Sequence, residues 1–381
     1  MKSICILSSL YPNIINPTSQ VFVQQLVWAI ADMGVECTII CPVAVNLHPR
    51  LIKLPASLTE ISDNGALIKV YFPKFISFGQ RTLAGIKTAH LTTNLYFNAV
   101  ERVWKQLEKK PEVIYGHFLT PAGICSSRIS KKYGIPSFAA FGESSPWSIL
   151  NYGKKQIKSE IDRLSGIVSV SSANESVLQN LDVFPLTKVR VFPNGIRMKR
   201  FYPHNKLLAR LKFGFKQEDF IVAFLGSFSE RKGVLRAAQA VNGLDGVSIA
   251  FAGSGTLQPQ ASNCIYKGIV KPEDVPVFLS AADVFLLPTL NEGCCNAVIE
   301  AMSCGLPIIS SNLEFNKDIL SPENALLIDP NNIHQIREAV IHLRDHPAVR
   351  TSMSVASLRM AKNLTIESRA ENIVSWVHQM I

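Results

Sequence analysis

The sequence alternates short apolar runs with segments of helical spacing, and this alternation constrains the fold more than any other feature. Residues 4–8 form an apolar run, residues 19–33 follow with helical spacing, and residues 36–41 form the next run. The pattern restarts at residues 220–225, after a break near residue 194. Short apolar strands alternating with helices are typical of parallel sheets covered on both faces. We therefore predict an α/β protein with two such units.

Length and turn residues indicate where the two units meet. The chain has 381 residues, and about 150 residues per domain suggests two domains. The strongest turn signal between the two patterns is Pro193-Asn194-Gly195. We predict an N-terminal domain over residues 1–195 and a C-terminal domain that begins at residue 196. Within the first domain, one long helix is expected over residues 82–109.

The basic charge of the chain belongs mainly to the first domain. The whole chain has 39 Lys and Arg against 29 Asp and Glu, a net charge of +10, and residues 1–195 account for +8 of it, with 20 against 12. A basic face and the aromatic segment 71–78 predict docking on anionic lipid headgroups. A solvated face with ordinary core aromatics is the simpler explanation of the same residues.

Several classes of protein do not fit the sequence. An apolar content of 47% excludes a disordered chain. No run of about 20 apolar residues could span a bilayer, and the eight cysteines contain no C-x-x-C pair, so we expect a cytoplasmic protein with free thiols. The Gly253-Ser254-Gly255 turn has Gln258 where a dinucleotide fingerprint needs glycine. No metal-ligand spacing and no nucleic-acid-binding motif appear, so we expect no metal cofactor and no nucleic-acid partner.

The stretch from Leu286 to Pro307 is the most informative candidate site. An apolar strand ends at Pro288, a polar turn follows, and a helix then runs to Gly305. Helix N-termini beyond strand ends present amides to phosphate oxygens. Glu292 in the turn and Glu300 in the helix offer carboxylates to sugar hydroxyls. A sugar nucleotide would use both kinds of group.

A second strand-turn-helix stretch carries two cations. Arg231 and Lys232 follow the run at 220–225 and stand before Gly233. Arg binds phosphate through two hydrogen bonds and Lys as a point charge. The pair could stabilise a departing nucleoside diphosphate without a metal.

Two strand ends in the first domain carry weaker candidates. His117 follows the run at 113–115, and Gly142 and Glu143 follow the run at 135–139. A lone histidine is more often structural than catalytic. Glu143 is either a substrate contact or an acid at the start of a helix.

Taken together, these residues resemble glycosyltransferase family 4, the group 1 glycosyltransferases of GT-B fold. The resemblance runs nearly end to end, and bacterial polysaccharide-assembly members are the most similar. The segments that carry it are Leu10-Tyr11-Pro12, Phe22-Val23, Gly116-His117-Phe118, Phe192-Pro193-Asn194-Gly195, Arg231-Lys232-Gly233, 281–288 and Glu292 to Glu300.

The resemblance implies two Rossmann-like domains that face an interdomain cleft, with the first on the acceptor side and residues 196–365 binding the nucleotide sugar. It also implies a last helix over about 366–381 that packs back on the first domain. The implied activity is retaining, metal-independent transfer of a sugar from a nucleotide-sugar donor to a saccharide acceptor, either lipid-linked or an oligosaccharide. The implied setting is cell-surface polysaccharide biosynthesis at the inner face of the plasma membrane.

The resemblance also assigns roles to residues. Glu292 and His117 would lie at the reaction centre, Glu300 would bind the ribose, and Arg231 and Lys232 the diphosphate. The other expected donor-binding residues are Gly293, Cys294, Cys295 and Asn296.

One candidate loop departs from the family pattern. Relatives usually have glycine near the position of Gln20 and a Gly-Ser-Asp sequence where this chain has Gly142-Glu143-Ser144. We therefore treat Gln20, Gly142 and Glu143 as a candidate acceptor or phosphate loop. A sugar-nucleotide epimerase and a nonenzymatic sugar-nucleotide binder are the alternative functions, and the sequence does not identify the donor sugar.

Overall fold

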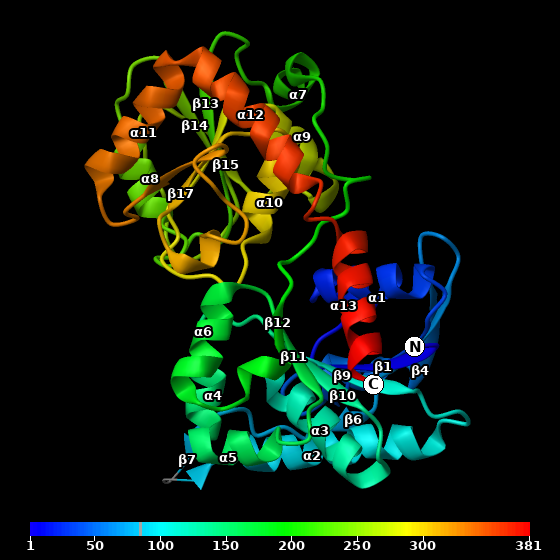
Figure 1. The fold of residues 1–381 in the computed structure, drawn as a ribbon. Coiled ribbons are helices and arrows are strands. Elements are labelled where there is room, and N and C mark those ends of the chain that lie inside the picture. The colour runs from blue at the N-terminus through cyan, green and yellow to red at the C-terminus, as the bar shows by residue number, and fades with distance from the viewer. Residues whose placement is uncertain (84–85) are drawn as a thin grey trace. The chain divides into compact units, whose positions relative to one another are not determined.

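The computed structural model describes residues 1–83 and 86–381, which form two compact units (Figure 1). Unit 1 contains Met1–Pro193 and Ile366–Ile381, and unit 2 contains Asn194–Thr365. The chain therefore enters unit 2 at Asn194, within the turn signal of the sequence, and returns to unit 1 at Ile366.

Unit 1 is built on an eight-stranded sheet in the order β12-β11-β10-β9-β1-β2-β5-β4. Its strands run parallel except for β4, which pairs antiparallel with β5 at one edge. The strands are β1 (Ser3–Ser8), β2 (Glu36–Ile40), β4 (Ser57–Ile61), β5 (Leu67–Tyr71), β9 (Val113–His117), β10 (Ser137–Phe141), β11 (Gly166–Ser169) and β12 (Val189–Val191).

Alternate residues of β1 bury opposite faces of this sheet. Ile4 and Ile6 belong to one core cluster, which includes side chains of α1 and α13. Cys5 and Leu7 belong to another, which includes side chains of α2 and α3. This period of two explains why the central strands read as continuous apolar runs. The helices of unit 1 are α1 (Val21–Asp32), α2 (Ala89–Gln106), α3 (Ile124–Tyr133), α4 (Trp147–Tyr152), α5 (Lys154–Glu160), α6 (Ser172–Leu181) and α13 (Ile366–Met380).

Helix α13, drawn in red, returns to unit 1 and lies beside α1 (Figure 1). Its Trp376 packs edge-on against Phe138 of β10, with ring centroids 5.5 Å apart. Gly166 of β11 leaves room for this indole, because a Cβ there would lie 2.9 Å from Trp376 Cζ2. The helix thus completes the core on its face of the sheet.

Two short ladders lie outside the main sheet of unit 1. Strand β3 (Val43–Ala44) pairs in parallel with β6 (Lys74–Phe75), and β7 (Thr82–Leu83) pairs antiparallel with β8 (Ile86–Lys87). The helix predicted over residues 82–109 was therefore wrong in its first part, since α2 begins at Ala89. Residues 84–85 of that prediction lie outside the described residues.

Unit 2 contains a six-stranded parallel sheet in the order β15-β14-β13-β16-β17-β18 around one continuous core. Its strands are β13 (Phe220–Leu225), β14 (Val247–Ala252), β15 (Cys264–Gly268), β16 (Val284–Leu287), β17 (Ile308–Ser311) and β18 (Ala325–Ile328). Its helices are α7 (Lys206–Phe213), α8 (Val234–Val241), α9 (Val275–Ser280), α10 (Asn296–Ser303), α11 (Ile333–Asp345) and α12 (Pro347–Ala361).

Within residues 1–83 and 86–381, no helix is both long enough and apolar enough to cross a membrane. All eight cysteines are free thiols.

Candidate active site

The order of strands in unit 2 brings two distant loops together. Strands β13 and β16 are neighbours, and the sheet extends from β13 through β14 on one side and from β16 through β17 on the other. Open α/β sheets bind ligands beyond the carboxyl ends of their strands at such a reversal of order. The loop after β13 carries Arg231 and Lys232, and the loop after β16 carries Glu292.

These three side chains meet at one carboxylate oxygen. Glu292 Oε1 lies 2.6 Å from Arg231 Nη1 and 2.6 Å from Lys232 Nζ. The side chains of Lys232 and Glu292 are only 13% and 11% exposed, whereas that of Arg231 is 41% exposed. Water is largely excluded from the Lys232–Glu292 pair, so its attraction is stronger than that of a surface pair.

Thr289 connects the two loops through hydrogen bonds. The sequence patterns did not single it out. Its hydroxyl donates to the Arg231 carbonyl at 3.1 Å and lies 3.0 Å from Glu292 Oε1. The Leu290 amide donates to the same Arg231 carbonyl at 2.8 Å. A buried threonine directly after a strand and its following proline is a signal that could have pointed to this residue.

Gly233 allows the loops to come this close. It caps α8 with φ of +77°, a conformation that favours glycine. A Cβ at this position would also overlap the Pro288 carbonyl of the neighbouring loop.

The start of α10 is anchored by Asn194, the first residue of unit 2. The Asn194 side chain donates to Asn296 Oδ1 at 2.8 Å and to the Cys294 carbonyl at 3.3 Å. Gly293 and Cys295 are buried. Asn296 is thus engaged within the protein. A pairing across about 100 residues leaves no local signal in the sequence.

Glu300 lies within α10 and is half-buried. Burial raises the pKa of its carboxyl to about 7, while the charges of Arg200 and Lys232 act in the opposite direction. Burial also raises the pKa of the Cys295 thiol, and the charges of Glu292 and Glu300 add to this effect. The charge of Lys232 lowers the pKa of the same thiol, so Glu292, Glu300 and Lys232 all act electrostatically on Cys295.

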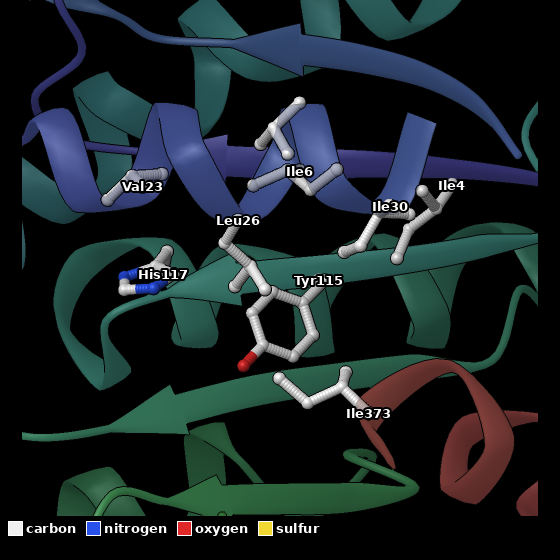
Figure 2. A pocket seen from close by; sticks show the side chains of 9 residues that line it. Ile4, Ile6, Val23, Leu26, Ile30, Tyr115, His117 and Ile373 are labelled. Carbon is white, nitrogen blue, oxygen red and sulfur yellow. The ribbon is translucent and has the colours of Figure 1, made fainter. Parts of the chain in front are cut away.

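His117 ends β9 in unit 1, where the residue is only 5% exposed. It borders a small apolar cavity between α1, β1, β9 and α13 (Figure 2), with about 10 Å³ of space, scarcely enough for one water. Among the described residues its buried Nδ1 has no hydrogen-bond partner. Burial, together with the charge of Arg369, lowers the pKa of His117 to about 3, so the ring is neutral at neutral pH.

The three residues of the candidate acceptor or phosphate loop also lie in unit 1. Gln20 caps α1 with φ of +52°, and its buried Oε1 has no partner among the described residues. Gly142 packs against Val170, where a Cβ would lie 2.8 Å from Val170 Cγ1. The Glu143 carboxylate accepts a hydrogen bond from Ser148, which opposes the rise in its pKa caused by burial. The Glu143 carboxylate therefore serves as a hydrogen-bond acceptor at the start of α4.

We found no cluster of three or more His, Cys, Asp or Glu arranged to hold a metal ion in the described part of the chain.

Comparison with known proteins agrees with this architecture. The family model for group 1 glycosyl transferases matches residues 219–346, which include the Arg231, Lys232 and Glu292 cluster. A putative teichuronic acid biosynthesis glycosyltransferase of Bacillus subtilis, TuaC, is 25% identical over 346 residues, covering 88% of this chain and 87% of that protein. The chain is a glycosyltransferase, and its residues 219–346 are similar to the group 1 family.

Other relatives and solved structures are similar to this glycosyltransferase. A UDP-Gal:alpha-D-GlcNAc-diphosphoundecaprenol alpha-1,3-galactosyltransferase of Escherichia coli is 29% identical over 217 residues, covering 52% of this chain and 56% of that protein. Sucrose-phosphate synthase of Thermosynechococcus elongatus has a TM-score of 0.77 at 17% identity, covering 100% of this chain and 99% of that chain. Anabaena HepE in complex with UDP has a TM-score of 0.74 at 14% identity, with both chains covered completely. The chain therefore has the GT-B fold, with two Rossmann-like domains.

Proposed function

We propose that this glycosyltransferase moves a sugar from a nucleotide-sugar donor to a lipid-linked saccharide acceptor in cell-surface polysaccharide biosynthesis. The observation that carries the donor part is the meeting of Arg231, Lys232 and Glu292 at the reversal between β13 and β16. The acceptor part is supported by relatives whose names include teichuronic acid biosynthesis and a diphosphoundecaprenol-linked sugar. The similarity to glycosyltransferases does not favour the epimerase and binder alternatives.

In this proposal unit 2 binds the donor. Arg231 and Lys232 hold the diphosphate and stabilise the charge that develops on it as the sugar leaves. A diphosphate so bound would take the place of Glu292 as their partner, and the released carboxylate would accept hydrogen bonds from the donor sugar. Glu300 accepts from the ribose hydroxyls, and Gly293 to Asn296 form the turn beneath the phosphates.

We propose transfer with retention and without a metal. The bond from the sugar to the donor phosphate breaks, the acceptor hydroxyl attacks from the same face, and its proton passes to the departing phosphate oxygen. The neutral His117 ring would offer a hydrogen bond to the donor sugar. Product stereochemistry by NMR and activity in excess chelator test these two features.

We also propose that unit 1 docks on anionic lipid at the inner face of the plasma membrane. Trp147 and Leu150 of α4 are 55% and 53% exposed. Lys154 and Lys155 follow at the start of α5 and are exposed without ion pairs among the described residues. Exposed aromatic and aliphatic side chains beside free lysines suit a charged lipid interface.

Transfer assays with a nucleotide-sugar panel and a lipid-linked acceptor test the main proposal. Glu292→Ala and Lys232→Ala should each reduce transfer at least 100-fold, whereas exposed Glu218→Ala and Lys216→Ala serve as matched controls and should not. Circular dichroism establishes that all four variants fold. Wild-type rates in both site variants would refute the proposal.

A further inference from the structure

Two histidines stand one helical turn apart at the end of α11, in a part of unit 2 that the donor site does not use. His342 belongs to the last turn of α11, and His346 ends this helix and directly precedes α12. Both residues are exposed. Residues four positions apart lie on the same side of a helix, and these two rings are stacked, with centroids 4.3 Å apart and planes inclined by 27°. The pair therefore presents its ring nitrogens together.

The ring of His346 is held in one tautomer by a backbone contact. Its Nδ1 lies 2.8 Å from the carbonyl oxygen of His342. A carbonyl only accepts hydrogen bonds, so Nδ1 carries the proton and the Nε2 of the neutral ring keeps its lone pair. Histidines that bind metals commonly donate the other ring N–H to a backbone carbonyl in this way, which fixes the orientation of the ring.

The ring nitrogens of His342 are available as well. Within residues 1–83 and 86–381, neither nitrogen takes part in a hydrogen bond or an ion pair, and the ring is engaged through its stack with His346. Two imidazoles at positions i and i+4 of a helix are a known arrangement for holding a zinc ion. The pair thus offers two nitrogen ligands from one surface.

The charges around the pair select the kind of cation that could bind. Asp345 is engaged by Arg344, whose Nε lies 2.7 Å from its carboxylate, and Glu338 lies one turn back beside His334, at 3.8 Å. Mg²⁺ and Ca²⁺ need several oxygen ligands, which this surface does not supply. Imidazole nitrogens instead suit zinc, nickel and copper.

The end of α11 lies on the side of unit 2 away from the donor residues. Arg344 donates from Nη1 to the Asp245 carbonyl at 2.8 Å, two residues before β14 begins. The guanidinium of Arg350, just beyond α11, lies 5.2 Å from the ring of Phe220, the first residue of β13. The pair is therefore near the amino ends of β13 and β14, whereas Arg231 follows the carboxyl end of β13.

We propose that His342 and His346 bind one Zn²⁺ ion through their ring nitrogens, with water in the remaining positions. Zinc is usually tetrahedral, and two protein ligands give a weaker site than the four of a structural zinc centre. Because His346 both ends α11 and precedes α12, the ion would stabilise the junction of these helices. It would take no part in the transfer reaction, which we propose to be independent of metal.

Zinc binding is tested with the full chain, first treated with a chelator and then titrated with ZnCl₂ by calorimetry. The wild type should bind one equivalent, and His342→Ala and His346→Ala should each weaken this binding at least tenfold. His334→Ala removes another exposed histidine of the same helix and serves as the matched control, with affinity equal to that of the wild type. MgCl₂ should not compete. Circular dichroism establishes that all three variants fold.

The free thiols are the other groups that could bind zinc, so a second probe separates them from the histidines. Co²⁺ bound to imidazole and water lacks the thiolate charge-transfer band that a cysteine ligand produces. No binding of Zn²⁺, a thiolate band from the bound Co²⁺, unchanged affinity in His342→Ala, or an equal loss in His334→Ala would each overturn the proposal.

The expected effect on stability is tested separately from binding. Because a ligand that binds only the folded state raises its stability, saturating Zn²⁺ should raise the Tm of the wild type but not that of His342→Ala. An equal change in both proteins would overturn the stabilising role. Transfer activity should be the same in His342→Ala and the wild type, and its loss in a folded variant would contradict a site remote from the reaction.

Discussion

Lys232 Nζ lies 2.6 Å from Glu292 Oε1, and both side chains are nearly shielded from water. Sixty residues separate them in the sequence, and the pairing of β13 with β16 brings them together. Arg231 shares the same oxygen, so this carboxylate balances two cations.

This ion pair should contribute measurably to the stability of unit 2. Removing one partner leaves a poorly hydrated charge, although Arg231 compensates in part. We expect Lys232→Ala and Glu292→Ala each to lower the free energy of unfolding by about 1–2 kcal/mol. The double variant should lose less than the sum of the two, by urea denaturation. Strict additivity would show that the two side chains do not interact.

Glu300 should make both stability and donor binding depend on pH. Its pKa is raised to about 7, so the folded state holds its proton more tightly than the unfolded chain, and stability falls as pH rises from about 4.5 to 7. Glu300→Gln should therefore be more stable than the wild type by about 1–2 kcal/mol at pH 8, and equal to it at pH 4.

Donor affinity should rise with pH, whereas stability falls. If the ionised Glu300 accepts from ribose, affinity rises as pH increases through about 7 in the wild type but not in Glu300→Gln. Calorimetric titration with nucleoside diphosphates at pH 6 and 8 measures this. A parallel pH response of both proteins would exclude Glu300 as the titrating contact.

His117 should remain neutral well below pH 6. Because its pKa falls from 6.5 to about 3, the stability it contributes is complete above pH 6.5 and is lost progressively as pH falls toward 3. Between pH 7 and 5 the wild type should lose about 2 kcal/mol more than His117→Phe. Chemical unfolding at both pH values tests this, and NMR titration of the ring provides a direct check. A ring that protonates near pH 6.5 would contradict the burial argument.

Replacing Gln20 with glycine should relieve backbone strain at the start of α1. Its φ of +52° lies in the left-handed region, which costs a residue with a side chain about 1 kcal/mol. Gln20→Gly should raise the unfolding free energy by about 0.5–1 kcal/mol relative to Gln20→Ala, which keeps the Cβ. Thermal and urea denaturation of the pair isolate the backbone effect. Equal stability of the two variants would show that the conformation is not strained in solution.

Membrane docking should depend on the residues at α4 and α5. Lys154→Glu with Lys155→Glu should weaken binding to phosphatidylglycerol vesicles at least tenfold at low salt, because each basic residue near an anionic surface contributes about 1 kcal/mol. Lys216→Glu with Lys362→Glu makes the same charge change on unit 2 and serves as control. Equal wild-type binding to neutral and anionic vesicles would refute the lipid proposal.

The central strands of both units could be read from the sequence because they are buried on both faces. Ile4 to Leu7 and Ile221 to Phe224 are all nearly inaccessible, so they appear as unbroken apolar runs. Strand β4 could not be found in this way. It lies at the sheet edge with alternating exposed and half-buried residues, and Ser57–Ile61 therefore lacks an apolar run.

Only part of the candidate donor site could be predicted from the sequence. Its residue types follow from strand-turn-helix patterns. The positive φ of Gln20, which suits the glycine usual in relatives, was not predicted. The contacts themselves depend on which strands are neighbours. The bond from Asn194 to Asn296 and the hydrogen bonds of Thr289 to the preceding loop are consequences of sheet order, which no local pattern encodes.

The return of α13 to unit 1 has a consequence for how the protein is made. Trp376 fills the space above Gly166, yet the ribosome adds it only after every residue of unit 2. Until then the apolar face that α13 covers remains open to water or to chaperones. We therefore expect the second unit to finish folding before the first, the reverse of their order of synthesis.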